Sequence, residues 1–239
     1  MRRIILLSTQ RSGSTMVCDD LAGAEVFGRP SEYFIRVLEK GDEVLSEDFA
    51  TVDKQGRTEN NVTSVKIMAN QVEKIGCAIV KAGLSKKAQP LAAFVDYFQQ
   101  AFLVRIYRRD KVAQAVSRIM ALETDVYHIA SNAEGLEGML GKLGKEQLGV
   151  NAEYSAPIIK AEIDKICDEE KLLDELLASF SRPAKTLVYE EIIEDRAYVQ
   201  AVADELDITQ FSLRLRRLEK MGGSLSRDWI ERYKAGLKT

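Results

Sequence analysis

The chain's first candidate for chemistry is a loop rich in hydroxyl and glycine residues, STQRSGST, which begins at Ser8. It follows an apolar run at residues 4–7 and precedes a helix-like pattern at residues 14–23. A helix N-terminus offers unpaired N–H groups and a partial positive charge, so it binds anions well. Gly13 permits a close backbone approach, and Arg11 adds a full charge with a forked set of donors. The same residue types also form ordinary caps and turns, which leaves a structural role open.

A second cationic position, Arg108-Arg109, directly follows the apolar run AFLVRIY. In a parallel sheet, ligands bind outside the carboxyl ends of the strands. Two cationic positions at neighbouring strand ends would suit a ligand with two separated phosphate groups. The alternative is that both arginines extend into solvent or pair with Asp110.

The loop departs from the nucleoside-triphosphate pattern G-x-x-x-x-G-K-[ST]. Its first glycine is absent, and Ser14 stands where the lysine would reach the β- and γ-phosphates. None of the predicted strands ends in the aspartate expected for magnesium, since one ends in Arg108-Arg109 and another in Tyr189-Glu190. We therefore expect no metal site and no tight handling of Mg-ATP.

The elements that must position these residues alternate along the chain. Buried runs predict strands at residues 3–8, 64–68, 101–107 and 184–190, and helical patterns at 14–23, 31–40, 70–83, 110–126 and from Ile159 to Phe180 separate them. This alternation predicts an α/β fold with a mostly parallel central sheet. Residues 41–62 are polar and predict a long loop or lid, and a glycine-rich stretch at 135–149 predicts a second mobile loop.

The length and net charge of the chain exclude some classes of function. The 239 residues suit a single domain with mobile segments at about 41–62 and 127–152, and the net charge of −3 gives no general attraction to nucleic acid or anionic membranes. The first apolar run is too short for a signal peptide, and no stretch suits a membrane span. Cys18, Cys77 and Cys167 lack C-x-x-C spacing and are expected to be reduced thiols, as in a cytoplasmic protein.

Several stretches together resemble one enzyme family: STQRSGSTMVCDDL, GRPSEYF, VKIMANQ, YRRDKVAQAVS and LEKMGGSLSRDWIERY. They are similar to the bacterial trehalose 2-sulfotransferase-like branch of the sulfotransferases that use PAPS, 3′-phosphoadenosine 5′-phosphosulfate. The resemblance covers nearly the whole chain. It implies a P-loop-type three-layer fold, transfer of the PAPS sulfonate to a hydroxyl of a carbohydrate or similar acceptor, PAP as the product, and a possible homodimer.

The resemblance also implies roles for individual residues. The 5′-phosphosulfate would be surrounded by Arg11, Ser12, Gly13, Ser14 and Thr15, with Arg11 also assisting catalysis. The 3′-phosphate would bind Arg108 and Ser117, and Lys220 would stand in a loop that closes over the nucleotide, where the family often has arginine. A further motif contains Lys66, Asn70 and Gln71, to which no role can be assigned from the sequence.

The general base implied by the resemblance is Glu32, the glutamate of GRPSEYF. Its structural alternative is a place in the first turn of a helix, where a glutamate interacts well with the helix dipole. The single histidine, His128, is a second candidate for the base or the acceptor pocket, or an ordinary loop residue. Tyr33, Phe34 and Tyr127 could form a sugar-stacking face or belong to the core.

Two rival functions remain open from the sequence. A small-molecule kinase with a degenerate loop would need Mg-ATP, for which the lysine and the acidic strand end are missing. A non-catalytic nucleotide sensor would keep the loop but would not need Glu32. Ligand choice would separate the three hypotheses. A sulfotransferase would bind PAP without metal, a kinase would bind Mg-ATP, and a sensor would bind PAP without transferring a sulfonate.

Overall fold

The computed structural model describes residues 2–124, 153–216 and 223–237. The chain divides into two compact units, one formed by Met1–Tyr107 with Glu169–Arg214 and the other by Arg108–Asp168 with Leu215–Thr239. A single domain over the whole chain stays a prediction.

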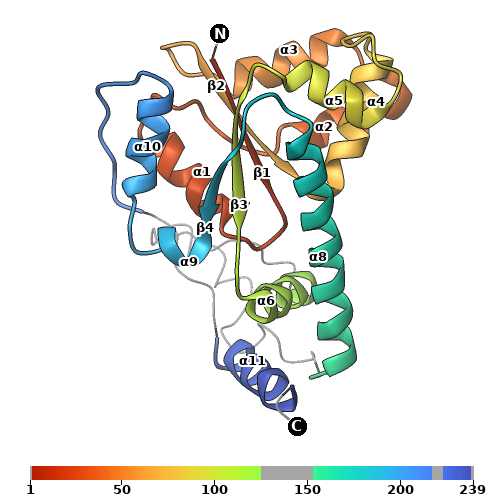
Figure 1. The fold of residues 1–239 in the computed structure, drawn as a ribbon, viewed down its shortest axis with the longest axis vertical. Coiled ribbons are helices and arrows are strands. Elements are labelled where there is room, and N and C mark those ends of the chain that lie inside the picture. Colours follow the sequence, from red (N-terminus) through yellow and green to blue (C-terminus); the bar gives the residue numbers. More distant parts are fainter. Residues whose placement is uncertain (1, 125–152, 217–222, 238–239) are drawn as a thin grey trace. The chain divides into compact units, whose positions relative to one another are not determined.

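The first unit is built on a sheet of four parallel strands in the order β2-β1-β3-β4 (Figure 1). The strands are β1 (Arg2–Ser8), β2 (Val62–Met68), β3 (Phe102–Tyr107) and β4 (Lys185–Val188). They confirm the four predicted strands and the parallel α/β fold. In the register of β1 and β2, Leu6 lies opposite Lys66, which places β2 beside the strand that leads into the STQRSGST loop.

Hydrophobic cores lie on both faces of this sheet, because successive side chains of β1 point to opposite sides. Ile5 and Leu7 belong to one core, and Ile4 and Leu6 to the other. The first core is covered by α2 (Phe34–Glu39), α3 (Ser46–Gln55), α4 (Val72–Lys81), α5 (Pro90–Phe98) and the end of α8 (Ala156–Ala178). The second is covered by α1 (Ser14–Gly23) and α10 (Ala197–Glu205). The predicted three layers are thus present (Figure 1).

The prediction of a long loop at residues 41–62 is wrong. This stretch holds a short 3-10 helix, Gly41–Glu43, then α3, and ends where β2 begins. Only Phe49 and Val52 of α3 are buried, so its apolar pattern is too sparse to stand out in the sequence. The side chain of Asp48 accepts a hydrogen bond from the Leu45 N–H at 2.9 Å, which caps the helix start.

The second unit contains α6 (Lys111–Thr124), the first part of α8 and α11 (Ser224–Gly236). Its core joins the three helices through Ala115, Val116, Ile119, Ile159, Ile166, Trp229 and Tyr233. A largely buried ion pair between Arg118 and Glu162, at 2.7 Å, links α6 to α8. Asp110 accepts hydrogen bonds from the Ala113 N–H and from Lys234, so it ties the start of α6 to α11.

Candidate functional site

The STQRSGST loop leaves β1 at its carboxyl end and leads into α1, as the sequence predicts. Arg11 and Gly13 both have left-handed backbone angles, with φ of 61° and 93°. The Ser12 hydroxyl donates a hydrogen bond to the Thr9 carbonyl at 2.8 Å, and both residues are buried. Left-handed residues in such a turn direct successive N–H groups into a concave anion site. We call residues 9–15 the cradle.

Gly13 lies against the ring of Tyr189, the first residue of α9 (Tyr189–Ile192). A Cβ atom at Gly13 would stand 2.4 Å from Tyr189 Cδ2, closer than any real contact allows. This contact places the carboxyl end of β4 beside the cradle. The sequence placed Tyr189 at a strand end but did not show that it packs on this loop.

A group of polar contacts in the first unit surrounds Glu32. Its Oε1 lies 2.9 Å from Lys66 Nζ, and its Oε2 accepts a hydrogen bond from Gln71 Nε2 at 3.2 Å. Lys66 Nζ also donates toward Thr15 Oγ1 at 3.4 Å. The side chain of Lys66 is 7% exposed and that of Glu32 is 25% exposed, so the carboxylate remains accessible while the ammonium group is covered. The cluster connects the predicted base to the cradle.

Backbone contacts explain why these side chains meet. Lys66 N–H, in β2, donates to the Ser31 carbonyl at 3.0 Å, which fixes the residue before Glu32 against the strand. Gln71 follows the end of β2, and its Oε1 accepts a hydrogen bond from the Met68 N–H at 3.0 Å. That contact turns the amide Nε2 of Gln71 toward Glu32, because an amide has one acceptor end and one donor end.

Glu32 does not occupy the first turn of a helix. The sequence predicts a helix from residue 31, but α2 begins at Phe34, two residues after Glu32. The structural alternative for Glu32, stabilisation by a helix dipole within the first turn, is therefore wrong, and the carboxylate binds Lys66 and Gln71 instead. Asn70, between these elements, is exposed.

The two aromatic residues after Glu32 differ in their surroundings. Phe34 is buried in the core and packs edge-to-face on Phe49, with ring centroids 5.5 Å apart. It is a core residue and not part of a sugar-stacking face. Tyr33 is partly exposed, and its hydroxyl donates to the Arg29 carbonyl at 2.7 Å, which braces the turn before Glu32.

Cys18 lies behind the cradle in α1 and is buried. Burial raises the pKa of its thiol to about 12, the Lys66 ammonium acts to lower it, and the Glu32 and Asp19 carboxylates act to raise it. The pKa of this thiol in the folded protein exceeds the ordinary value of 9.0. Its contribution to the free energy of unfolding is therefore complete below pH 9 and is lost as the pH rises from about 9 toward 12. The thiol is protonated at neutral pH and is not a nucleophile there.

We expect alkylation at pH 8 to modify the exposed Cys167 long before Cys18. At Cys18 a pKa of about 12 in place of the ordinary 9.0 leaves about 10³-fold less thiolate, and burial slows access further. Peptide mapping by mass spectrometry over a time course measures both rates. Both thiols should react together once urea unfolds the chain, and equal rates in the native protein would contradict the buried placement of Cys18.

The remaining predicted site residues lie in the second unit or outside the described residues. Arg108 directly follows β3, and its carbonyl accepts a hydrogen bond from Lys111 Nζ. Ser117 lies within α6. The described residues do not include Lys220, His128, Tyr127 or the predicted mobile segments at 127–152 and 135–149.

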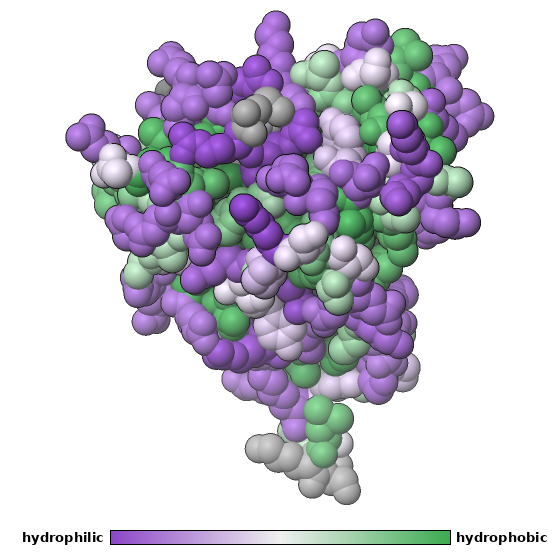
Figure 2. Space-filling view, turned by 45° about the horizontal axis from the view of Figure 1, so that its top comes forward, coloured by the Kyte–Doolittle hydropathy of each residue, from purple (hydrophilic) through white to green (hydrophobic). Residues whose placement is uncertain are grey.

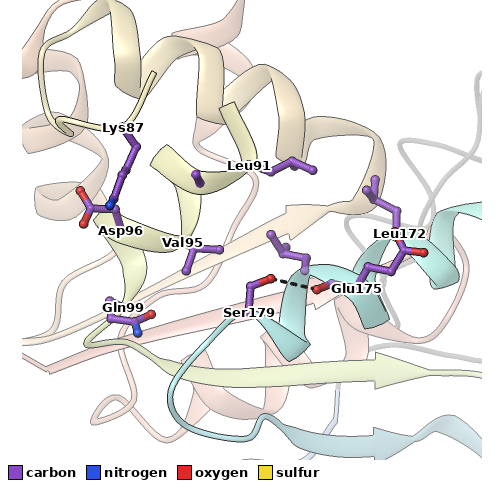
Figure 3. A pocket seen from close by; sticks show the side chains of 10 residues that line it. Lys87, Leu91, Val95, Asp96, Gln99, Leu172, Glu175 and Ser179 are labelled. Carbon is purple, nitrogen blue, oxygen red and sulfur yellow. Dashed lines mark hydrogen bonds between the residues drawn. The ribbon is translucent and has the colours of Figure 1, made fainter. Parts of the chain in front are cut away.

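A pocket of about 500 Å³ lies between α5 and the end of α8 in the first unit (Figure 3). Leu91, Val95 and Leu172 give it an apolar wall, and Asp96, Gln99 and Glu175 are polar. Both helices end just before β3 and β4 begin, so the pocket lies at the amino ends of these strands. The cradle lies at the carboxyl end of β1, so the two sites are separate.

Among the described residues, no group of histidine, cysteine and acidic side chains is arranged to hold a metal ion. The helices within those residues are also too short or too polar to cross a membrane. On the face seen in Figure 2, hydrophilic residues predominate and hydrophobic ones lie between them.

Comparison with known proteins gives one family. The model of a family described as Stf0 sulphotransferase matches residues 3–236. A crystal structure of a sulfotransferase from Alicyclobacillus acidocaldarius is similar in fold, with a TM-score of 0.55 over 100% of this chain and 96% of that chain, at 12% sequence identity. No curated protein matches the sequence.

Proposed function

Because the chain belongs to the Stf0 sulphotransferase family and is a sulfotransferase, we propose that it transfers the sulfonate of PAPS to a carbohydrate or similar hydroxylated acceptor. The observation that carries this proposal is the Glu32 cluster. An accessible carboxylate is held by Lys66 and Gln71, and the same lysine reaches Thr15 of the cradle. A base beside an anion site is what sulfonate transfer to a hydroxyl requires.

In this proposal the cradle holds the 5′-phosphosulfate. The donors are the N–H groups at the start of α1, the Arg11 guanidinium and the hydroxyls of Ser12, Ser14 and Thr15, with Gly13 allowing close approach. Arg108 and Ser117 bind the 3′-phosphate, and Lys220 is a further nucleotide-binding residue. No metal is needed, because arginine and backbone dipoles meet the charge on the leaving phosphate.

The reaction is a single displacement at sulfur. The acceptor hydroxyl gives its proton to Glu32 while its oxygen attacks the sulfur of the bound donor. The bond between sulfur and the bridging oxygen of the 5′-phosphate breaks, and its electron pair stays with PAP. Arg11 and the cradle N–H groups stabilise the charge that develops there. The products are a sulfate ester, PAP and a protonated Glu32.

A ligand-dependent shift in melting temperature tests the donor site. At about 100 times its Kd, PAP without metal should stabilise the protein by about 2.7 kcal/mol, which is a rise of roughly 5–10 °C for a chain of this size. Arg108→Ala should reduce this rise, since it removes a cation from the 3′-phosphate site. Unchanged PAP affinity in Arg108→Ala would contradict that assignment.

The other outcomes identify the rival functions. Stabilisation by Mg-ATP alone would support a kinase with a degenerate loop, and PAP binding without transfer to any acceptor would support a sensor. If PAP does bind, a screen of sugars and other hydroxylated metabolites with labelled PAPS identifies the acceptor. Three further points stay predictions: that residues 41–62 and 127–152 contact the acceptor, that the protein forms a homodimer, and that its location is cytoplasmic.

A further inference from the structure

Lys66 is a buried lysine in the middle of a strand, which is an uncommon place for a charge. Burying an ammonium group is costly unless it is paired and hydrogen-bonded. Lys66 meets this requirement by its 2.9 Å contact with Glu32 Oε1. The same ammonium group also reaches Thr15 Oγ1, in the cradle, at 3.4 Å.

The position of Lys66 compensates for a feature that the cradle lacks. Nucleoside-triphosphate loops of this type carry a lysine that reaches the phosphates, and here Ser14 stands in its place. β2 runs parallel to β1 with Lys66 opposite Leu6, so its side chain can approach the cradle from the neighbouring strand. An ammonium group has three donors, and the contacts described for Lys66 use two of them.

We propose that Lys66 couples the donor site to the base, holding the Glu32 carboxylate in place while contributing its charge to the anion bound in the cradle. This inference rests on the proposed function. Lys66 is then needed both for nucleotide affinity and for turnover. It acts on the acceptor's proton only through Glu32, for which it is a positioning residue.

Gln71 provides the comparison that separates these two effects. It contacts the other carboxylate oxygen, Glu32 Oε2, and its own orientation is fixed by the Met68 N–H. The contacts described for Gln71 do not include a residue of the cradle. Gln71 is therefore a positioning residue for Glu32 alone, with an effect on turnover and none on nucleotide affinity.

The experiment compares PAP affinity by calorimetry and kcat in three variants. Lys66→Met keeps the length of the side chain and removes its charge, so we expect PAP to bind about 10-fold more weakly and kcat to fall about 10²-fold. Gln71→Met should lower kcat about 10-fold with unchanged PAP affinity. Lys81→Met is the control, because it removes a lysine whose ion pair with Asp42 lies on the surface.

A double substitution tests whether Lys66 acts through Glu32. In a Glu32→Gln background, Lys66→Met should lower kcat by no more than about 3-fold further, because residues that act as a unit are not additive. It should still weaken PAP binding about 10-fold. Lys66→Arg, which retains the charge, should recover most of the PAP affinity. Should Lys66→Met melt below the assay temperature, Lys66→Gln carries the same comparisons.

Unchanged PAP affinity in Lys66→Met would overturn the coupling, as would a full further loss of kcat in the Glu32→Gln background. These outcomes differ from failure of the proposed function. A wild-type protein that neither binds PAP nor transfers sulfonate would refute the function itself, before any Lys66 variant is made.

Discussion

Glu32→Gln is expected to lower kcat about 10²- to 10⁴-fold, equivalent to roughly 3–5 kcal/mol in the activation barrier. The amide cannot take the acceptor's proton, but it has nearly the same shape as the carboxylate. Its carbonyl oxygen can still accept a hydrogen bond from Lys66 or from Gln71, which are 2.9 Å and 3.2 Å from the native carboxylate. The geometry of the cluster should therefore survive, and PAP affinity should stay nearly unchanged.

Steady-state transfer from PAPS, together with PAP titration of the same preparations, measures both quantities. Glu39→Gln is the matched control, since it makes the same chemical change on an exposed residue at the end of α2. A Glu32→Gln variant that retains most of its turnover would show that Glu32 is not the base. His128, the other candidate from the sequence, would then be replaced next.

Gly13→Ala is expected to abolish most PAP binding and to destabilise the fold. Gly13 has φ of 93°, a left-handed angle that costs an L-residue about 1–2 kcal/mol. In addition, the new Cβ would stand 2.4 Å from Tyr189 Cδ2, so either the ring or the loop must move. In the proposed function residues 9–15 hold the phosphosulfate, so movement of the loop would take the N–H donors away from it. We expect PAP to bind at least about 10²-fold more weakly, a loss of about 2.7 kcal/mol.

The variant Gly83→Ala separates the cost of the left-handed angle from the cost of the contact with Tyr189. Gly83 also has a left-handed angle, φ of 66°, but an added Cβ would meet nothing within 4 Å. Its substitution should lower the free energy of unfolding by about 1–2 kcal/mol and leave PAP affinity unchanged. Chemical denaturation and calorimetry compare the two variants. Equal effects of Gly13→Ala and Gly83→Ala on both measurements would show that the contact with Tyr189 has no consequence.

The sequence was informative about the sheet because buried parallel strands are continuous apolar runs, and the alternating helices follow from local periodicity. The STQRSGST loop was equally visible, since it is a run of small and hydroxyl residues between an apolar run and a helical pattern. α3 was missed because only Phe49 and Val52 of its residues are buried. A helix with two buried residues owes its stability to the sheet it packs on, which a local pattern cannot show.

For the site, the sequence by itself predicted an anion-binding loop at STQRSGST, residues 8–15, and the resemblance of GRPSEYF to a known family predicted Glu32 as the base. Only the tertiary structure decided what surrounds Glu32. Lys66 lies 34 positions further along the chain and Gln71 lies 39, and each is brought to the carboxylate by the pairing of β2 with β1 and by the turn after β2. Tyr189, at the end of β4, reaches Gly13 in the same way. Local residue patterns determine which elements form, but contacts between distant residues depend on strand order and register, which arise only when the whole sheet assembles.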